Sequence, residues 1–289
     1  MITLLSHIQE EYERWAKAIA QEDPYKSART IGMDDVLRAH FLLIDYFTRE
    51  GEGYGGVGPR DPDLLHSALS RQFTGFGQKK KWKSKHAMCA TLFFGLIMDH
   101  PFHDCNKRTA FLVLLYHLLL LGRWPDTKQR DFETLAVRTA DHRLSAYPAW
   151  HRFADKSDAE VRFIADYLKR NTRNIDKRYY TITYNDLQRI LKGFGCRLNN
   201  PHANKIDVEQ LVEQRRLLGK RKREFKRVGQ IGFPGWTRQV GKGAINTVRS
   251  KTGLIPENGY DSKVFFKGVD PMPSLIDEFR GPLERLADR

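Results

Sequence analysis

The nonapeptide His-Pro-Phe-His-Asp-Cys-Asn-Lys-Arg, residues 100–108, joins two strongly apolar segments at residues 86–98 and 111–121. Segments that are apolar on nearly every side are buried inside a domain, so both are expected to be core helices. A short polar connection between two such helices is held on rigid elements, where a site can be precise. This stretch therefore decides how the first half of the chain is arranged, and it holds the densest group of reactive side chains.

The spacing of apolar residues predicts further helices around this stretch, over residues 3–20, 33–47, 62–70 and 132–139. Residues 51–62 hold five glycines and two prolines and predict a loop. Ser157-Asp-Ala-Glu160 fits a capping box, which predicts the start of a helix there. That helix is expected to end near Arg173, where we place a domain boundary.

The second half of the chain predicts a mixed fold. We expect a helix over 183–192, a strand from Phe194 turned by Asn199-Asn200-Pro201, a hairpin with arms over 205–218 and 222–233, and helices around 244–248 and over 273–287. The expected fold class is α+β. A helical domain at residues 1–173, with an N-terminal extension helix in 1–29, precedes a basic α+β accessory domain at residues 174–289.

The net charge of +14 is uneven, because residues 1–170 contribute +3 and residues 171–289 contribute +11. The basic residues gather in Arg215-Arg216 and in Lys220–Arg227. A region this basic predicts an anionic partner, most often nucleic acid, so RNA or a ribosome-associated partner is expected for residues 171–289. The alternative is a solvated basic face without a ligand.

Three cysteines, far apart and odd in number, argue against a disulfide framework and favour a reducing compartment. The N-terminus lacks the basic start and apolar core of a cleavable signal. The longest apolar run, Phe111–Leu121, has 11 residues and is too short to span a bilayer. We therefore expect a cytoplasmic protein without a membrane partner.

The nonapeptide combines groups that suit nucleotide chemistry. Asn106-Lys107-Arg108 would open a helix, where free backbone N–H groups and two cations form an anion site suited to a polyphosphate. Asp104 is a hard oxygen ligand suited to Mg²⁺, and His100 carries an imidazole, the side chain that most often serves as a general base. Together they suggest transfer of part of a nucleotide to a hydroxyl, a reaction that depends on positioning and charge neutralisation.

The stretch from His100 to Ala110 resembles the Fic/Doc motif, His-x-Phe-x-Asp/Glu-Gly/Ala-Asn-Gly/Lys-Arg, and is most similar to its Doc, or "death on curing", branch. Residues 55–69 resemble the N-terminal signature of the same family. The resemblance covers roughly residues 30–173 and implies an all-helical Fic/Doc-type domain. It implies ATP and Mg²⁺ as cofactors, His100 as base, Asp104 on the metal, and Asn106, Lys107 and Arg108 on phosphates.

Two positions bear on the reaction that the resemblance implies. AMP-transferring Fic proteins usually have Gly where Lys107 stands and a second Arg where this chain has Phe111. Doc-like proteins have the Lys, lack the second Arg and transfer the γ-phosphate of ATP. The resemblance therefore implies a toxin of a toxin-antitoxin or defence system that phosphorylates a Ser/Thr hydroxyl, for which elongation factor Tu, the Doc substrate, is the model. Cys105 departs from the family's Gly or Ala. At this position in the anion loop it is expected to contact the cofactor, and its side chain is expected to crowd the loop and so to weaken binding or add redox sensitivity.

Two other segments of the first half also resemble parts of the family. Residues 72–85, with five lysines, resemble the flap that docks the target backbone as an added strand; the alternative is an exposed basic loop. Residues 48–53 fit the Ser/Thr-x-x-x-Glu-Gly pattern of Fic inhibitory helices. They run into a Gly-rich loop without helical context, so we interpret this match as coincidence. Restraint is expected from the second half or from a separate antitoxin.

Residues 181–254 resemble HicA-like modules, which have a double-stranded-RNA-binding-like fold, and His202 lies where some of them cleave RNA. The Gly-Ser that precedes that His in the modules is absent, and a lone His in a turn is usually just exposed. Three hypotheses follow: a Doc-like kinase, an AMP-transferring Fic enzyme, and an RNA-binding or RNA-cleaving protein with a degenerate Fic-like half.

Overall fold

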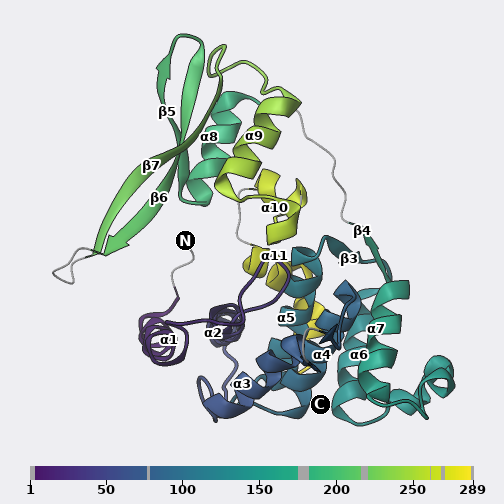
Figure 1. The fold of residues 1–289 in the computed structure, drawn as a ribbon. Helices are drawn as coiled ribbons and strands as arrows, with labels where there is room; N and C mark the ends of the chain where they lie inside the picture. The colour runs from purple at the N-terminus through teal and green to yellow at the C-terminus, as the bar shows by residue number, and fades with distance from the viewer. Residues whose placement is uncertain are drawn as a thin grey trace. The chain divides into compact units, whose positions relative to one another are not determined.

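The computed structural model describes residues 4–76, 79–174, 182–215, 221–260, 262–267 and 271–287 (Figure 1). It divides the chain into two compact units. We call residues 2–174 with 275–289 the motif unit, and residues 175–274 the basic unit. The architecture is α+β, with a helical N-terminal part and small antiparallel sheets, so the predicted fold class is confirmed.

The motif unit is built mainly from helices: α1 (Ser6–Ile19), α2 (Met33–Arg49), α3 (Pro62–Ser70), α4 (Lys85–Met98), α5 (Asn106–Leu120), α6 (Gln129–Ala140), α7 (Ala159–Arg170) and α12 (Arg280–Arg285). Short 3-10 turns lie at Arg71–Phe73, Leu144–Ala146 and Pro148–Arg152. As predicted, α4 and α5 are almost wholly buried, and they pack against each other. Residues 99–105, which we call the motif loop, connect the end of α4 to the start of α5. No helix in the described ranges is long and apolar enough to cross a membrane.

Two small ribbons complete the motif unit. β1 (Gly75–Phe76) pairs antiparallel with β2 (Lys79–Lys80), so part of the predicted flap is a two-stranded ribbon, whose tip residues 77–78 lie outside the described ranges. β3 (Arg123–Pro125) pairs antiparallel with β4 (Thr172–Asn174). This second ribbon joins the segment after α5 to the end of α7, just before the expected boundary at Arg173.

The basic unit is a three-stranded antiparallel sheet in the order β5 (Cys196–His202), β6 (Lys205–Arg215), β7 (Arg221–Gly232), with α8 (Tyr184–Gly193), α9 (Lys242–Thr252) and α10 (Ser262–Lys267). Leu198, Ile206 and Val208 belong to one apolar core with Leu187 of α8 and Val248 of α9. The helices therefore cover one face of the sheet near β5. The hairpin tip at 216–220, with Arg216 and Lys220, lies outside the described residues.

Two local predictions were wrong. The capping box at Ser157 does not form, since α7 starts after Asp158, whose side chain makes no capping bond and instead pairs with Lys81 at 2.7 Å. The turn expected at residues 199–201 is part of β5, and the chain reverses at Ala203-Asn204, both with positive φ. Two residues with positive φ match the twist of a tight hairpin, so this shorter turn replaces the Pro-containing one.

The C-terminal segment differs most from its expected place. The helix expected over 273–287 is interrupted at Phe279, between α11 (Pro271–Glu278) and α12. Residues 275–289 belong to the motif unit and not to the accessory domain in which we expected them. Phe279 packs edge-on against Phe111 and Trp124, and Leu283 is fully buried. The basic unit is thus inserted between two parts of the motif unit.

Candidate active site

The motif loop is pinned to the first turn of α5 by Asn106. Its side-chain oxygen accepts a hydrogen bond from the backbone N–H of Phe102 at 2.9 Å, and its amide donates to the Phe102 carbonyl at 2.8 Å. Both polar ends of Asn106 therefore hold the loop backbone. The predicted contact of Asn106 with a phosphate stays a prediction, and the structure gives this residue a positioning role beside it.

His40, which the sequence analysis did not select, lies beneath the loop. Its ring stacks on Phe102 with centroids 4.0 Å apart, its Nε2 accepts from the Gly58 N–H at 3.1 Å, and its Nδ1 lies 3.2 Å from the Thr109 hydroxyl. An Nε2 that accepts leaves the ring proton on Nδ1. Burial lowers the pKa of His40 to about 3, so the ring is neutral. A histidine on the apolar side of the helix over 33–47 was the available signal for it.

The Gly-rich loop serves the site structurally. Arg60 N–H donates to the Pro101 carbonyl at 2.8 Å, and Pro59 forms a β-bridge with Phe102. Gly56 has φ +159°, and a Cβ there would lie 2.8 Å from the side chain of His103. The close approach of these two loops thus requires a glycine at this position.

Asp104 faces the same loop. One carboxylate oxygen accepts from the Gly55 N–H at 2.8 Å, and the other accepts from the Cys105 N–H at 2.5 Å. Within the described ranges, no three His, Cys, Asp or Glu side chains gather as a metal-ligand group. A single carboxylate still suits Mg²⁺, because this ion is commonly held by one or two carboxylates with substrate phosphates and water. The predicted metal role of Asp104 stays a prediction.

His100 is exposed and has φ +45°, a left-handed backbone conformation that is uncommon for a residue with a side chain. Such conformations persist only where the surrounding structure imposes them. Its side chain makes no hydrogen bond or ion pair with any described residue, so it is accessible to a substrate hydroxyl. Its predicted role as base stays a prediction.

Cys105 also has a left-handed backbone, with φ +58°, at the residue before α5. Burial first, and then the neighbouring Asp104 carboxylate, raise the pKa of its thiol to about 11. The thiol is therefore protonated at neutral pH, which disfavours oxidation and metal binding because both proceed through the thiolate. The Cys105 contact with the cofactor remains a prediction; a Gly or Ala here would leave more room in the anion loop.

The two cations of the motif differ sharply. Asn106, Lys107 and Arg108 form the first turn of α5, where N–H groups have no partner inside the helix. Lys107 is half-buried and makes no contact with any described residue that would hold its ammonium. Arg108 is 5% exposed and is held on several sides. The anion site predicted at this helix end is therefore open at Lys107 and closed at Arg108.

Glu52 and the C-terminal segment close the site at Arg108. The guanidinium forms an ion pair with Glu52 at 2.7 Å and donates to the Leu283 carbonyl at 2.8 Å. It also lies 3.8 Å from the centroid of the Phe47 ring, in cation–π geometry. The match of residues 48–53 to an inhibitory pattern thus has a structural counterpart that we did not expect, because α2 extends to Arg49 and brings Glu52 onto the motif.

Further contacts fix the C-terminal segment in place. Arg285 pairs with the buried Glu133 of α6 at 2.7 Å, and Arg280 pairs with Glu50 at 2.7 Å. Phe111, where AMP-transferring relatives of the motif have an Arg, is fully buried. Its ring packs against Phe279, and this position therefore offers the site a buried apolar side chain in place of a second arginine.

The second predicted site is distant in sequence and simpler. His202 ends β5 next to the tight turn, it is exposed, and its backbone pairs with Lys205. Its side chain makes no contact with any residue in the described part of the basic unit. The other predicted catalytic residues all belong to the motif unit.

The comparisons agree with the motif. The model of the Fic/DOC family matches residues 30–118, from the start of α2 through most of α5. Searches of curated proteins and of solved structures gave no match to the chain. The matched region includes the Gly-rich loop, the flap and the whole nonapeptide, so the part of the chain that is similar to Fic/DOC proteins carries all the described groups of the candidate site except the C-terminal segment.

Proposed function

We propose that this protein is a Doc-like kinase of the Fic superfamily that transfers the γ-phosphate of ATP to a Ser or Thr hydroxyl of a target protein. The family match supports a transferase of this superfamily. The observation that carries the choice of phosphate over AMP is the pair Lys107 and Phe111. Lys107 is available at the helix end, and the buried Phe111 replaces the arginine expected of an AMP-transferring enzyme.

The proposed reaction assigns one task to each group. His100 accepts the proton of the target hydroxyl, whose oxygen attacks the γ-phosphorus while the bond from that phosphorus to the bridging oxygen breaks and ADP leaves. Lys107 and the free N–H groups at the start of α5 neutralise the developing charge. Asn106 and His40 hold the loop in place. Arg108 would join the phosphate contacts once Glu52 releases it.

Mg²⁺ fits this assignment at Asp104, which lies two residues before the start of α5, where the phosphates would bind. Bound there with the phosphates, it would supply charge neutralisation. The protein groups described above keep their tasks irrespective of that ion.

The biological role that we propose is that of a toxin in a toxin-antitoxin or defence system, acting in the cytoplasm and restrained by an antitoxin or inhibitory partner. Elongation factor Tu is the first target to test, because the Doc branch phosphorylates one of its threonines. RNA or a ribosome-associated partner of the basic unit would bring the enzyme to its target.

The test uses ATP labelled at either the α- or the γ-phosphate, incubated with the full chain and a cell extract or purified elongation factor Tu. We expect label from the γ-position in a protein band, at least 100-fold less with His100→Ala, as for loss of a general base. Lys107→Ala is expected to reduce γ-transfer at least tenfold, with unchanged stability.

The other outcomes decide against the kinase. Label arriving only from the α-position would establish AMP transfer. If neither label moves and RNA is degraded in wild type but not in His202→Ala, the motif unit is a scaffold and the chain is an RNA-cleaving protein.

A further inference from the structure

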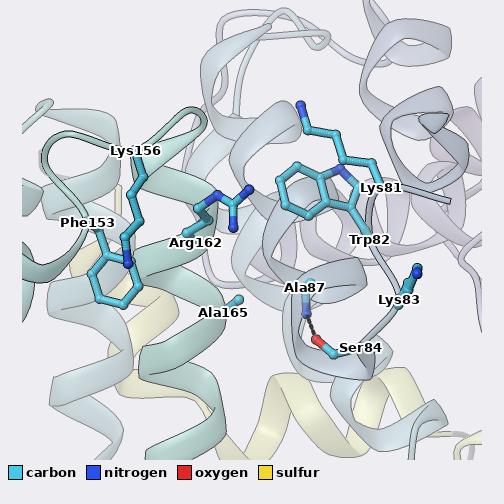
Figure 2. A pocket seen from close by; sticks show the side chains of 9 residues that line it. All are labelled: Lys81, Trp82, Lys83, Ser84, Ala87, Phe153, Lys156, Arg162 and Ala165. Atoms are coloured by element: carbon cyan, nitrogen blue, oxygen red, sulfur yellow. Dashed lines mark hydrogen bonds between the residues drawn. The ribbon is translucent and has the colours of Figure 1, made fainter. Parts of the chain in front are cut away.

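A pocket of about 310 Å³ lies beside the flap, within the motif unit, and belongs to none of the groups assigned above. It is bounded by the segment after β2 on one side and by the chain around the start of α7 on the other (Figure 2). The lining residues are Lys81, Trp82, Lys83, Ser84, Ala87, Phe153, Lys156, Arg162 and Ala165. Four of the nine are cationic and none is acidic, which makes the pocket selective for anions.

The cations are largely uncompensated. Lys81 pairs with Asp158 at 2.7 Å, which ties the end of the flap to the start of α7. Lys83, Lys156 and Arg162 form no ion pair with any described carboxylate. Arg162 donates its Nε to the Ser157 carbonyl at 2.8 Å, which fixes the side chain while its terminal nitrogens stay available. Figure 2 shows its guanidinium between the rings of Trp82 and Phe153, with Lys156 beside Phe153.

The two aromatic rings of the pocket, Trp82 and Phe153, indicate which class of anion it binds. Trp82 is 6% and Phe153 is 8% exposed, and a lysine already lies over each ring, Lys81 at 5.0 Å from the Trp82 centroid and Lys156 at 5.2 Å from the Phe153 centroid. Binding of single-stranded nucleic acid relies on open aromatic faces for base stacking, which this pocket lacks. An apolar wall beside Arg162 instead strengthens its pairing with a carboxylate, which the guanidinium fork matches in shape.

The flap gives such a ligand a path. β1 and β2 form a ribbon that pairs with no other described strand, so an extended chain can add to it as a further strand. Lys79 and Lys80 of this ribbon are exposed, and the chain runs directly from them through Lys81 into the pocket. A strand docked on the flap would therefore pass the pocket within a few residues, because extended chains advance about 3.3 Å per residue.

We propose that this pocket binds aspartate or glutamate side chains of the target protein, so that the enzyme selects hydroxyls flanked by an acidic segment. The inference rests on the proposed function for its biological meaning, since it names the class of target. Binding of the acidic segment itself does not require transfer and is measured without ATP.

The probe is a fluorescein-labelled ten-residue peptide with three consecutive glutamates, and its partner is the same peptide with glutamines. Fluorescence anisotropy with the full chain is expected to give at least tenfold tighter binding of the glutamate peptide. The double variant Lys156→Gln/Arg162→Gln is expected to lose at least fivefold of that affinity. The control Lys17→Gln/Lys128→Gln removes the same charge from two lysines outside the pocket and is expected to bind as wild type.

Zero-length carbodiimide coupling then locates the peptide, because it joins carboxylates to amines in contact. Couplings to Lys83 and Lys156 support the pocket. Equal affinity for both peptides, an equal loss in the control variant, couplings confined to the basic unit, or stronger displacement by oligouridine than by unlabelled glutamate peptide would each overturn the proposal.

The two proposals fail separately. If His100→Ala still binds the glutamate peptide while wild type transfers no label, the kinase is wrong and the pocket stands. If wild type transfers γ-phosphate but the pocket variant keeps the same KM for acidic targets, the kinase stands and the pocket proposal is wrong.

Discussion

The start of α5 and the open face of the three-stranded sheet are both rich in cations, and both were expected to meet phosphates. On the sheet three arginines are paired: Arg197 with Glu209 at 2.7 Å, Arg223 with Glu213 at 2.6 Å and Arg227 with Asp207 at 2.9 Å. At α5 one cation, Arg108, is held and its neighbour Lys107 is not. The comparison teaches that local pairing, and not the count of basic residues, decides which charges can bind a ligand.

The largest expected effect separates the two motif cations. Arg108→Ala leaves Glu52 and the Leu283 carbonyl without their donor, and it should lower the free energy of unfolding by about 3 kcal/mol. Lys107→Ala should change it by less than about 0.5 kcal/mol, as at other uncontacted positions. Urea unfolding followed by circular dichroism checks both. Equal losses in the two variants would contradict the contrast drawn here.

Acid should distinguish the motif unit from the basic unit. Burial lowers the pKa of His40 to about 3, whereas the one histidine of the basic unit, His202, is exposed. A histidine whose pKa is lowered by folding stabilises the fold at pH values above its pKa in the unfolded chain, about 6.5. This contribution is lost as the pH falls from there towards 3. Between pH 7 and pH 5, His40 should lower the free energy of unfolding by about 2 kcal/mol.

His40→Gln tests this expectation, because glutamine cannot take up the proton. The variant should lose less stability than wild type between pH 7 and pH 5, measured by thermal unfolding at each pH. Parallel losses in both proteins would show that other groups, such as His117, whose pKa burial lowers to about 4, carry the acid sensitivity.

Glu52→Gln should activate the enzyme, since it removes the charge that holds Arg108 while preserving the shape of the side chain. We expect γ-phosphate transfer to rise threefold to tenfold, about 1 kcal/mol in the barrier. Glu22→Gln is the matched control, because Glu22 is exposed and forms no ion pair with any described residue. A fall in rate, with the protein fully folded, would mean that Glu52 supports the site.

The smallest effect is expected on the sheet. Arg227→Gln should weaken binding of a 20-base-pair RNA less than threefold, because its charge is already compensated by Asp207. Lys226→Gln, at an exposed neighbour without a described partner, should weaken it more and reduce the salt dependence. Fluorescence anisotropy at two salt concentrations measures both. A larger loss of RNA affinity with Arg227→Gln than with Lys226→Gln would show that pairing with Asp207 does not keep Arg227 from binding RNA.

Local sequence rules predicted much of the motif unit. Pro62 at the first helical position and the polar start at Asn106 set the first residues of α3 and α5, and both helices begin where expected. The Thr183–Asp186 capping box forms as the rule requires. The Ser157 box does not form, because Asp158 has a left-handed backbone, with φ +52°, and α7 therefore starts one residue later than the box requires.

Local sequence rules could not predict which partners hold Arg108 in the site. The nonapeptide named the reactive residues, but Glu52 and Leu283 reach Arg108 from 56 and 175 positions away. The sequence pattern predicted a helix over 273–287 without showing which domain that helix packs against. That choice depends on complementary shape and on partners such as Phe111 and Glu133, which no local pattern encodes.

The return of residues 275–289 to the motif unit bears on how the protein is made. Chains fold from the N-terminus as they are synthesised, at about 5–20 residues per second. Residues 2–174 can collapse early, yet the contacts of Phe111 with Phe279, of Glu133 with Arg285 and of Arg108 with the Leu283 carbonyl form only after the whole basic unit has been translated. Residues 275–289 therefore complete the core around the motif, and place the Leu283 carbonyl against Arg108, only late in synthesis. A chain that ends before these residues would carry the motif without this restraint.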